Sequence, residues 1–163
     1  MEIDILIEDF AWFTSGIEDL ADEICPLVLS HLGLDPDDFE LSLLACDDDR
    51  IATLNAEFLG KSTPTNVLSW PSREVPARLD GATPPKPVCG EGIFELGDIA
   101  IAHGTCAREA EAVGKTMADH TRHLLAHGML HLLGYDHERD GDAALMQSIE
   151  TRILARLGIA DPY

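Results

Sequence analysis

The chain has 163 residues, of which 45% are hydrophobic and 25% are charged. This length is typical of one domain, and the hydrophobic fraction is sufficient for a core that needs no disulfide or cofactor. The formal net charge is −19, from 11 basic and 30 acidic residues. The chain as a whole therefore lacks the excess of basic residues with which most nucleic-acid binders neutralise phosphates.

The cysteines and the N-terminus indicate the cellular compartment. The four cysteines are widely scattered, without a C-x-x-C pair: Cys25, Cys46, Cys89 and Cys106. This favours free thiols in a reducing cytoplasm over two disulfides. The start of the chain lacks the basic region of a secretory signal, and no apolar run approaches the length of a membrane span. We therefore expect a soluble cytoplasmic protein without a membrane partner.

The first third of the chain predicts a strand followed by a helix. Alternating isoleucines indicate a half-buried strand over about residues 2–8. Thr14 or Ser15 should cap a helix whose apolar positions follow helical spacing as far as Gly33. Pro26 lies inside that pattern, so it should kink or split the helix.

The middle of the chain repeats this order. A second strand is expected over residues 39–46, and the acidic run 47–49 is suited to begin a helix because carboxylates favour its N-terminal dipole. That helix should end at Gly60. A short strand over residues 65–70 follows, and Pro71 should end it.

Residues 72–92 are rich in proline and glycine, which predicts a loop without regular secondary structure. Its length makes it either a mobile flap over a site or a dispensable insertion. The next strand is expected over residues 93–101, where Gly97 marks a bulge or a close approach to a ligand. A helix over about residues 105–113 should end at Gly114.

The most informative stretch is 127–137, with the sequence HGMLHLLGYDH. His127 and His131 are four residues apart, so on a helix their imidazoles would lie on one face and could hold one ion. Gly134 is suited to end the helix, after which the chain can return His137 as a third ligand. Three imidazoles without a fourth protein ligand leave one position open, as in catalytic zinc sites.

Two alternatives for these histidines are weaker. Metzincin peptidases have the same spacing, but Gly128 stands where their pattern H-E-x-x-H-x-x-G-x-x-H has the glutamate that serves as general base. His123 and His127 form a competing pair four residues apart. His137 follows Gly134 and can fold back only onto the C-terminal end of the helix, so we assign His123 to hydrogen bonding behind the ligands or in the core.

The histidine helix is expected over about residues 116–133, and a last amphipathic helix over about residues 140–157. Together these elements predict one α+β domain over residues 1–163. A small mixed sheet of about four strands should be covered by helices, with the zincin-like histidine helix buried against it. The metal should lie at the bottom of a cleft walled by the strand at residues 65–71.

The histidine block resembles the signature of the YbeY family, the bacterial endoribonucleases that mature ribosomal RNA. Two further blocks resemble this family, KSTPTNVLSWP at residues 61–71 and LGDI at residues 96–99, and the terminal DPY resembles that of some members. The resemblance extends from about Leu54 to the C-terminus. It implies a hydrolase that cleaves single-stranded RNA during maturation of the 3′ end of the small-subunit 16S ribosomal RNA and acts in ribosome quality control. It also implies the small ribosomal subunit or ribosomal proteins as partners.

All-imidazole ligation favours one zinc ion per chain, although another divalent ion is possible. The general base is left open between Asp98 and Asp136, and either could instead be structural or orient a ligand imidazole. Lys61 is the nearest cation for catalysis or phosphate binding. Candidate contacts to phosphate or base come from polar residues near the short strand, which could equally be turn residues: Thr65, Asn66 and Ser69.

Leu59 departs from the family pattern, because members commonly have an arginine just before the Gly-Lys pair. An arginine would bind phosphate with two parallel hydrogen bonds, whereas Lys61 offers only a point charge. With the net charge of −19, this departure supports an alternative in which the protein is a ribosome-assembly binding factor with a mainly structural metal. We attribute most of the acidic charge to solubility, and a docking face for basic ribosomal proteins is a second hypothesis.

Overall fold

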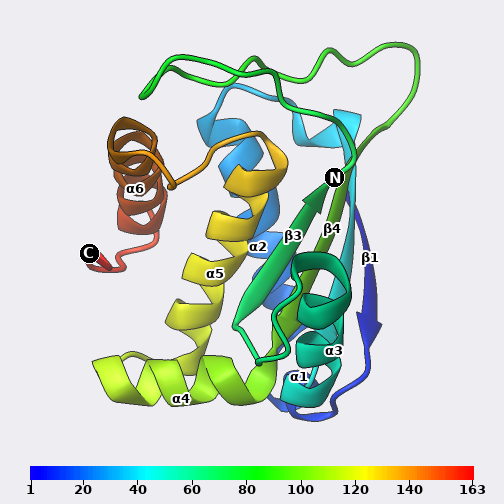
Figure 1. Ribbon diagram of the computed structural model, residues 1–163, viewed down its shortest axis with the longest axis vertical. Helices are drawn as coiled ribbons and strands as arrows, with labels where there is room; N and C mark the ends of the chain where they lie inside the picture. Colours follow the sequence, from blue (N-terminus) through cyan, green and yellow to red (C-terminus); the bar gives the residue numbers. More distant parts are fainter.

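A computed structural model describes residues 1–163 and shows one mixed sheet flanked by helices (Figure 1). The strands are β1 (Glu2–Ile7), β2 (Phe39–Cys46), β3 (Val67–Pro71) and β4 (Phe94–Ala102). Their order is β1-β2-β4-β3; β1, β2 and β4 are parallel, and β3 lies antiparallel at the edge. The predicted α+β domain with a four-stranded mixed sheet is confirmed.

The helices form layers on both faces of the sheet. They are α1 (Ala11–Thr14), α2 (Ile17–His31), α3 (Asp48–Leu59), α4 (His103–Val113), α5 (Met117–Leu132) and α6 (Asp140–Ala155), with a 3₁₀ turn η1 at Pro36–Asp38. The main core lies where α2 and α5 cover one face, a smaller cluster lies under α3 on the other, and α6 packs outside α5 (Figure 1). None of the helices combines the length and the apolar character needed to cross a bilayer.

One expectation about the first helix was wrong, and another was wrong in part. Neither Thr14 nor Ser15 caps it, because the chain first forms the short α1 and then reverses at Gly16, which has φ +69° and is the N-cap of α2. Pro26 does not split α2, which continues as one helix to His31. Burial of the apolar residues on both sides of Pro26 outweighs the single backbone hydrogen bond that proline removes.

Gly97 sets the orientation of β4. The pairing with β2 shifts register at this point, and Gly97 has φ +133°, so the strand carries a bulge. A Cβ atom at this position would overlap the carbonyl oxygen of Trp70 in β3. The predicted bulge is therefore present, and the close approach is to the neighbouring backbone. Beyond the bulge, Ile99 and Ile101 face α2 and α5, whereas Asp98 faces α3.

The 72–92 loop is fastened to the ends of the two helices that frame the candidate site. It passes over the C-terminal end of α5 and the N-terminal end of α6 (Figure 1). The backbone amide of Gly81 donates to the Asp142 carboxylate at 2.9 Å, and the Asp142 amide donates to Asp80 at 2.8 Å. Gly134 lies so close to Val75 that a Cβ atom there would be 2.8 Å from its methyl group. The loop therefore contacts both helices in this structure and forms a wall beside them.

Candidate metal centre

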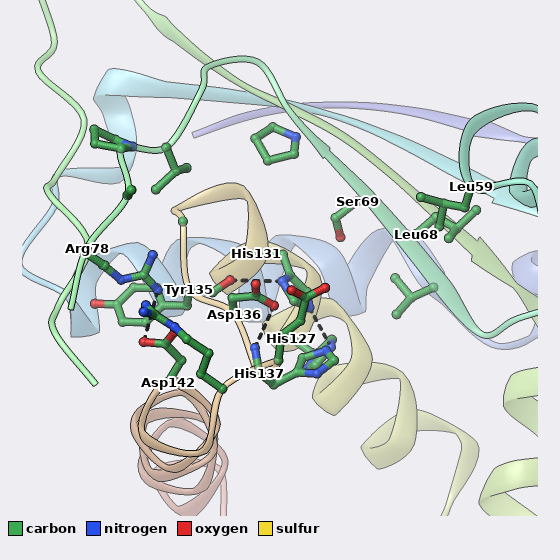
Figure 2. A pocket seen from close by; sticks show the side chains of 18 of the residues that line it. Leu59, Leu68, Ser69, Arg78, His127, His131, Tyr135, Asp136, His137 and Asp142 are labelled. Atoms are coloured by element: carbon green, nitrogen blue, oxygen red, sulfur yellow. Dashed lines mark hydrogen bonds and ion pairs between the residues drawn. The ribbon is translucent and has the colours of Figure 1, made fainter. Parts of the chain in front are cut away.

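Three histidine side chains converge at the C-terminal end of α5 (Figure 2). Helical spacing places the Nε2 atoms of His127 and His131 only 3.0 Å apart. Gly134 has φ +97°, which allows the chain to reverse after α5 and return His137. One ligand atom from each histidine lies within 4.8 Å of the others. The structure thus brings together the three histidines predicted as ligands, and this group could hold a metal ion.

Hydrogen bonds to the far side of two rings leave the facing nitrogen atoms free. His131 Nδ1 donates to the backbone carbonyl of Tyr135 at 3.0 Å, and His127 Nδ1 donates to Glu150 Oε1 at 2.5 Å. With its proton on Nδ1, each neutral imidazole presents the Nε2 lone pair to the centre. Such outer hydrogen bonds are typical of metal-binding histidines, because they fix the tautomer and the ring orientation. The donor set therefore fits a divalent ion.

Glu150 on α6 is the residue behind the ligands that the sequence analysis missed. Its side chain is fully buried, and besides His127 it hydrogen-bonds to the C-terminal Tyr163 hydroxyl and to His123 Nε2 at 3.4 Å. His123 therefore occupies the place behind the ligands that was predicted for it. A signal for Glu150 was present in the sequence, because this carboxylate interrupts the buried stripe of α6 between Ile149 and Ile153.

The surroundings of these groups favour the protonation states that metal binding needs. Burial is the main cause that lowers the pKa of His131 to about 4, and the neighbouring His127 and His137 lower it further. Burial alone would raise the pKa of Glu150, but hydrogen bonds from His123 and His127 outweigh it and hold that pKa at about 2. A neutral ligand imidazole and an ionised carboxylate behind it result.

The metal-free protein is expected to lose stability in two acid windows. His131 ordinarily titrates at 6.5 but at about 4 in the fold, so the unfolded state binds more protons and stability falls as the pH drops from about 6.5 to 4. Glu150 ordinarily titrates at 4.5 but at about 2 in the fold, so its contribution is complete above 4.5 and is lost as the pH falls to about 2. Urea unfolding midpoints measured against pH in chelator would show both windows.

Two substitutions separate these windows. His131→Ala should reduce the pH dependence between 6.5 and 4, to which His120 also contributes, and Glu150→Gln should reduce that between 4.5 and 2. Midpoints that keep their full pH dependence in both variants would contradict these assignments.

The histidines lie at the bottom of an open cavity of about 880 Å³. One wall is formed by β3 and the residues before it, and the facing wall by the 72–92 loop and the N-terminal end of α6 (Figure 2). Ser69 and Leu68 lie on the strand side of the histidines, whereas Arg78 and Asp142 lie on the loop side. This is the cleft walled by the short strand that was expected to hold the metal.

The family described as "Endoribonuclease YbeY" matches residues 4–158 of the chain. The chain belongs to the YbeY family. A relative in Jannaschia sp. named "Endoribonuclease YbeY" is 56% identical over 163 residues and covers 100% of both chains. A second relative with this name, in Ruegeria pomeroyi, is 54% identical and covers 100% of this chain and 98% of its own. The solution structure of a Thermotoga maritima protein shares the fold, with a TM-score of 0.55 and 21% identity over 98% of this chain and 97% of its own.

The polar residues near β3 that were predicted to contact the substrate differ in whether their side chains already form hydrogen bonds within the protein. Thr65, Asn66 and Ser69 all line the cavity. The Asn66 side chain donates to Glu109 at 3.0 Å and accepts from the Val67 amide at 2.7 Å, so it is engaged within the protein. The Ser69 hydroxyl has no hydrogen-bond partner in the protein, and it is buried against Gly128 of α5.

The two candidate general bases lie in different places. Asp136 lines the cavity beside the histidines and accepts a hydrogen bond from the His137 backbone amide at 2.7 Å. Asp98 is exposed on the α3 face of the sheet, in a separate cavity of about 520 Å³. The bulge at Gly97 turns it away from α5, so the structure does not bring Asp98 to the metal centre. Lys61 is exposed after α3 and does not line the histidine cavity.

Gly128 explains why this centre has no glutamate next to its first histidine. It is buried against the sheet, and a Cβ atom there would lie 3.0 Å from Ile99 Cδ1 and 3.2 Å from Ser69 Oγ. A longer side chain would have to displace one of these neighbours. The position that carries the general base in metzincins thus faces the sheet in this chain, and a side chain there would require Ile99 or Ser69 to shift.

Proposed function

We propose that this chain is a metal-dependent endoribonuclease that cleaves single-stranded RNA in the maturation of the 3′ end of 16S ribosomal RNA. The observation that carries this proposal is the convergence of His127, His131 and His137 at the floor of an open cavity. The full-length relatives named "Endoribonuclease YbeY" give this centre its substrate class. Ribosomal RNA in the small subunit, with its ribosomal proteins, is then the partner.

The ion is most simply zinc, because three imidazole donors with an open fourth position suit it well. When bound, such an ion supplies Lewis acidity toward a phosphoryl oxygen and makes water in the site more acidic. The chain keeps the ligands ready for it: Tyr135 and Glu150 hold the protons of His131 and His127 on the outer nitrogen atoms. The ligands therefore need little reorganisation when the ion binds.

Asp136 is the carboxylate that we propose as general base. It lines the histidine cavity and is only partly exposed, so it can accept a proton from water near the scissile phosphate. Its hydrogen bond from the His137 amide fixes the carboxylate on the turn that carries the third ligand. Thr65 lines the opposite wall and is partly exposed, so its hydroxyl can contact the substrate, whereas the Ser69 hydroxyl on the same wall is buried.

Cleavage of a single-stranded RNA by the purified protein tests this proposal. We expect cleavage that stops on treatment with a chelator and returns when zinc is added back, with a fully paired RNA of the same sequence as the control. An RNA that stays intact with one metal ion bound per chain would contradict the nuclease function.

The ribosome-assembly binding factor is the second candidate, and Leu59 favours it. Leu59 lines the cavity at the end of α3, at the position where the resemblance to the family implies an arginine. Its side chain is 58% exposed, so it leaves that end of the cavity without a cation. Leu59→Arg should increase cleavage about tenfold, because it adds a charge-assisted phosphate contact. Steady-state cleavage rates measure this, and an unchanged rate would show that the position is unimportant for turnover.

A further inference from the structure

Two arginines line the loop side of the cavity and have no role in the proposed reaction. Apart from histidines, Arg78 and Arg139 are the only basic residues that line the cavity. Arg78 comes from the 72–92 loop, and Arg139 is the N-cap residue of α6. Figure 2 shows Arg78 on the opposite side of the three histidines from Leu59. The two arginines of the cavity therefore lie on the loop side, away from Leu59.

One buried carboxylate positions both arginines. Asp142 is only 4% exposed; its Oδ2 accepts from Arg139 Nε at 2.8 Å, and its Oδ1 lies 3.7 Å from Arg78 Nη2. Oδ1 also accepts from the Gly81 amide. The two guanidinium groups thus share one carboxylate, and Asp80 accepts from the Asp142 amide close by.

Arg139 has exposed hydrogen-bonding capacity to spare. Arg139 uses Nε for Asp142, its terminal nitrogen atoms make no hydrogen bond within the protein, and its side chain is 47% exposed. Arg78 donates through Nε to the Ala82 carbonyl, its side chain is only 14% exposed, and its Nη2 is buried near Asp142, so its role is to support the Asp142 carboxylate that holds Arg139. A guanidinium held at Nε with free terminal nitrogen atoms is suited to bind a phosphate. The two acidic residues that also line the cavity near His137 are Asp136 and Glu138.

We propose that Arg139, supported by Arg78, binds a phosphate of the RNA strand that flanks the scissile position. This inference rests on the proposed function and adds to it the direction of the strand across the cavity. The strand passes from the β3 wall over the histidines to the 72–92 loop. The loop is then part of the substrate-binding surface, and Asp142 is the residue that positions the two arginines.

Salt-dependent RNA binding to the metal-free protein tests this inference without requiring cleavage. Fluorescence anisotropy of a labelled single-stranded RNA would be measured in chelator at several salt concentrations. Arg139→Gln should weaken binding about tenfold at low salt and reduce the log–log salt slope by about 0.7, because one phosphate is no longer neutralised. Arg139→Lys keeps the charge and should keep the slope. A purely structural cap would leave the slope unchanged in both variants.

Arg50 provides a matched control on the other face of the sheet. Its side chain is also 47% exposed and is also paired through Nε with a carboxylate, Glu8, at 3.2 Å. Arg50→Gln should leave affinity and slope as in the wild type. Equal affinity and slope for the wild type and Arg139→Gln, including the case in which neither binds, would overturn the inference. Binding that depends on Arg139 without any cleavage by the metal-loaded wild type would instead overturn the nuclease function and leave the phosphate site standing.

Discussion

Replacing His131 by alanine is expected to remove the bound metal ion and to reduce RNA cleavage by about 10³-fold, since Lewis-acid stabilisation is worth several kcal/mol. His131 is the central ligand in sequence, and its Nε2 atom lies 3.0 Å from that of His127. Its loss leaves two imidazoles, which are too few for a stable site of this kind. Metal content by mass spectrometry and cleavage rates on the same samples would measure both effects.

His120 supplies the control for this substitution. It lies on the same helix three turns earlier and hydrogen-bonds to Glu109, away from the three ligands. His120→Ala should retain one ion per chain even if the fold loses some stability. A His131→Ala protein that still binds one ion per chain would show that the metal lies elsewhere.

Replacing Glu150 by alanine is expected to weaken metal binding 10- to 100-fold, in the range of ~1–3 kcal/mol, because partners behind a ligand tune its affinity by this amount. The carboxylate is fully buried and holds the His127 proton on Nδ1. Without it, His127 can turn or change tautomer, and the Tyr163 hydroxyl loses its partner. Competition with a chromophoric zinc chelator would give the affinity.

Glu150→Gln separates orientation from charge. Glutamine keeps an oxygen that can accept the His127 proton, so its metal affinity should lie between those of the wild type and Glu150→Ala. A Glu150→Ala protein with wild-type metal affinity and wild-type cleavage would show that the carboxylate serves stability alone.

The ligand set could be predicted from the sequence because its geometry is local. His127 and His131 meet through the helical repeat alone, and Gly134 marks the reversal that returns His137. The strands could also be predicted from the sequence, because alternating apolar residues specify one face of a sheet over a few positions. The expected split of α2 at Pro26 did not occur, because helix propensity is overridden when the flanking residues are deeply buried.

Asp98 shows where alternation fails. Leu96 faces the main core, so strict alternation would direct Asp98 to the same face, toward α5. The bulge at Gly97 inserts one residue, and every side chain after it changes face. The sequence marked Gly97 as a candidate bulge, but the outcome for Asp98 depended on how β4 pairs with β2 and β3.

The sequence by itself determined the element order, the histidine ligands and the glycine that lets the third one return, because each depends on residues that are close in the chain. Only the tertiary structure decided which side chains hydrogen-bond to the ligands and which line the cavity next to them. Glu150 reaches His127 because α6 packs on α5, and Arg78 reaches Asp142 because the 72–92 loop crosses the start of α6. Such pairs are far apart in sequence, and no local rule fixes the packing that brings them together.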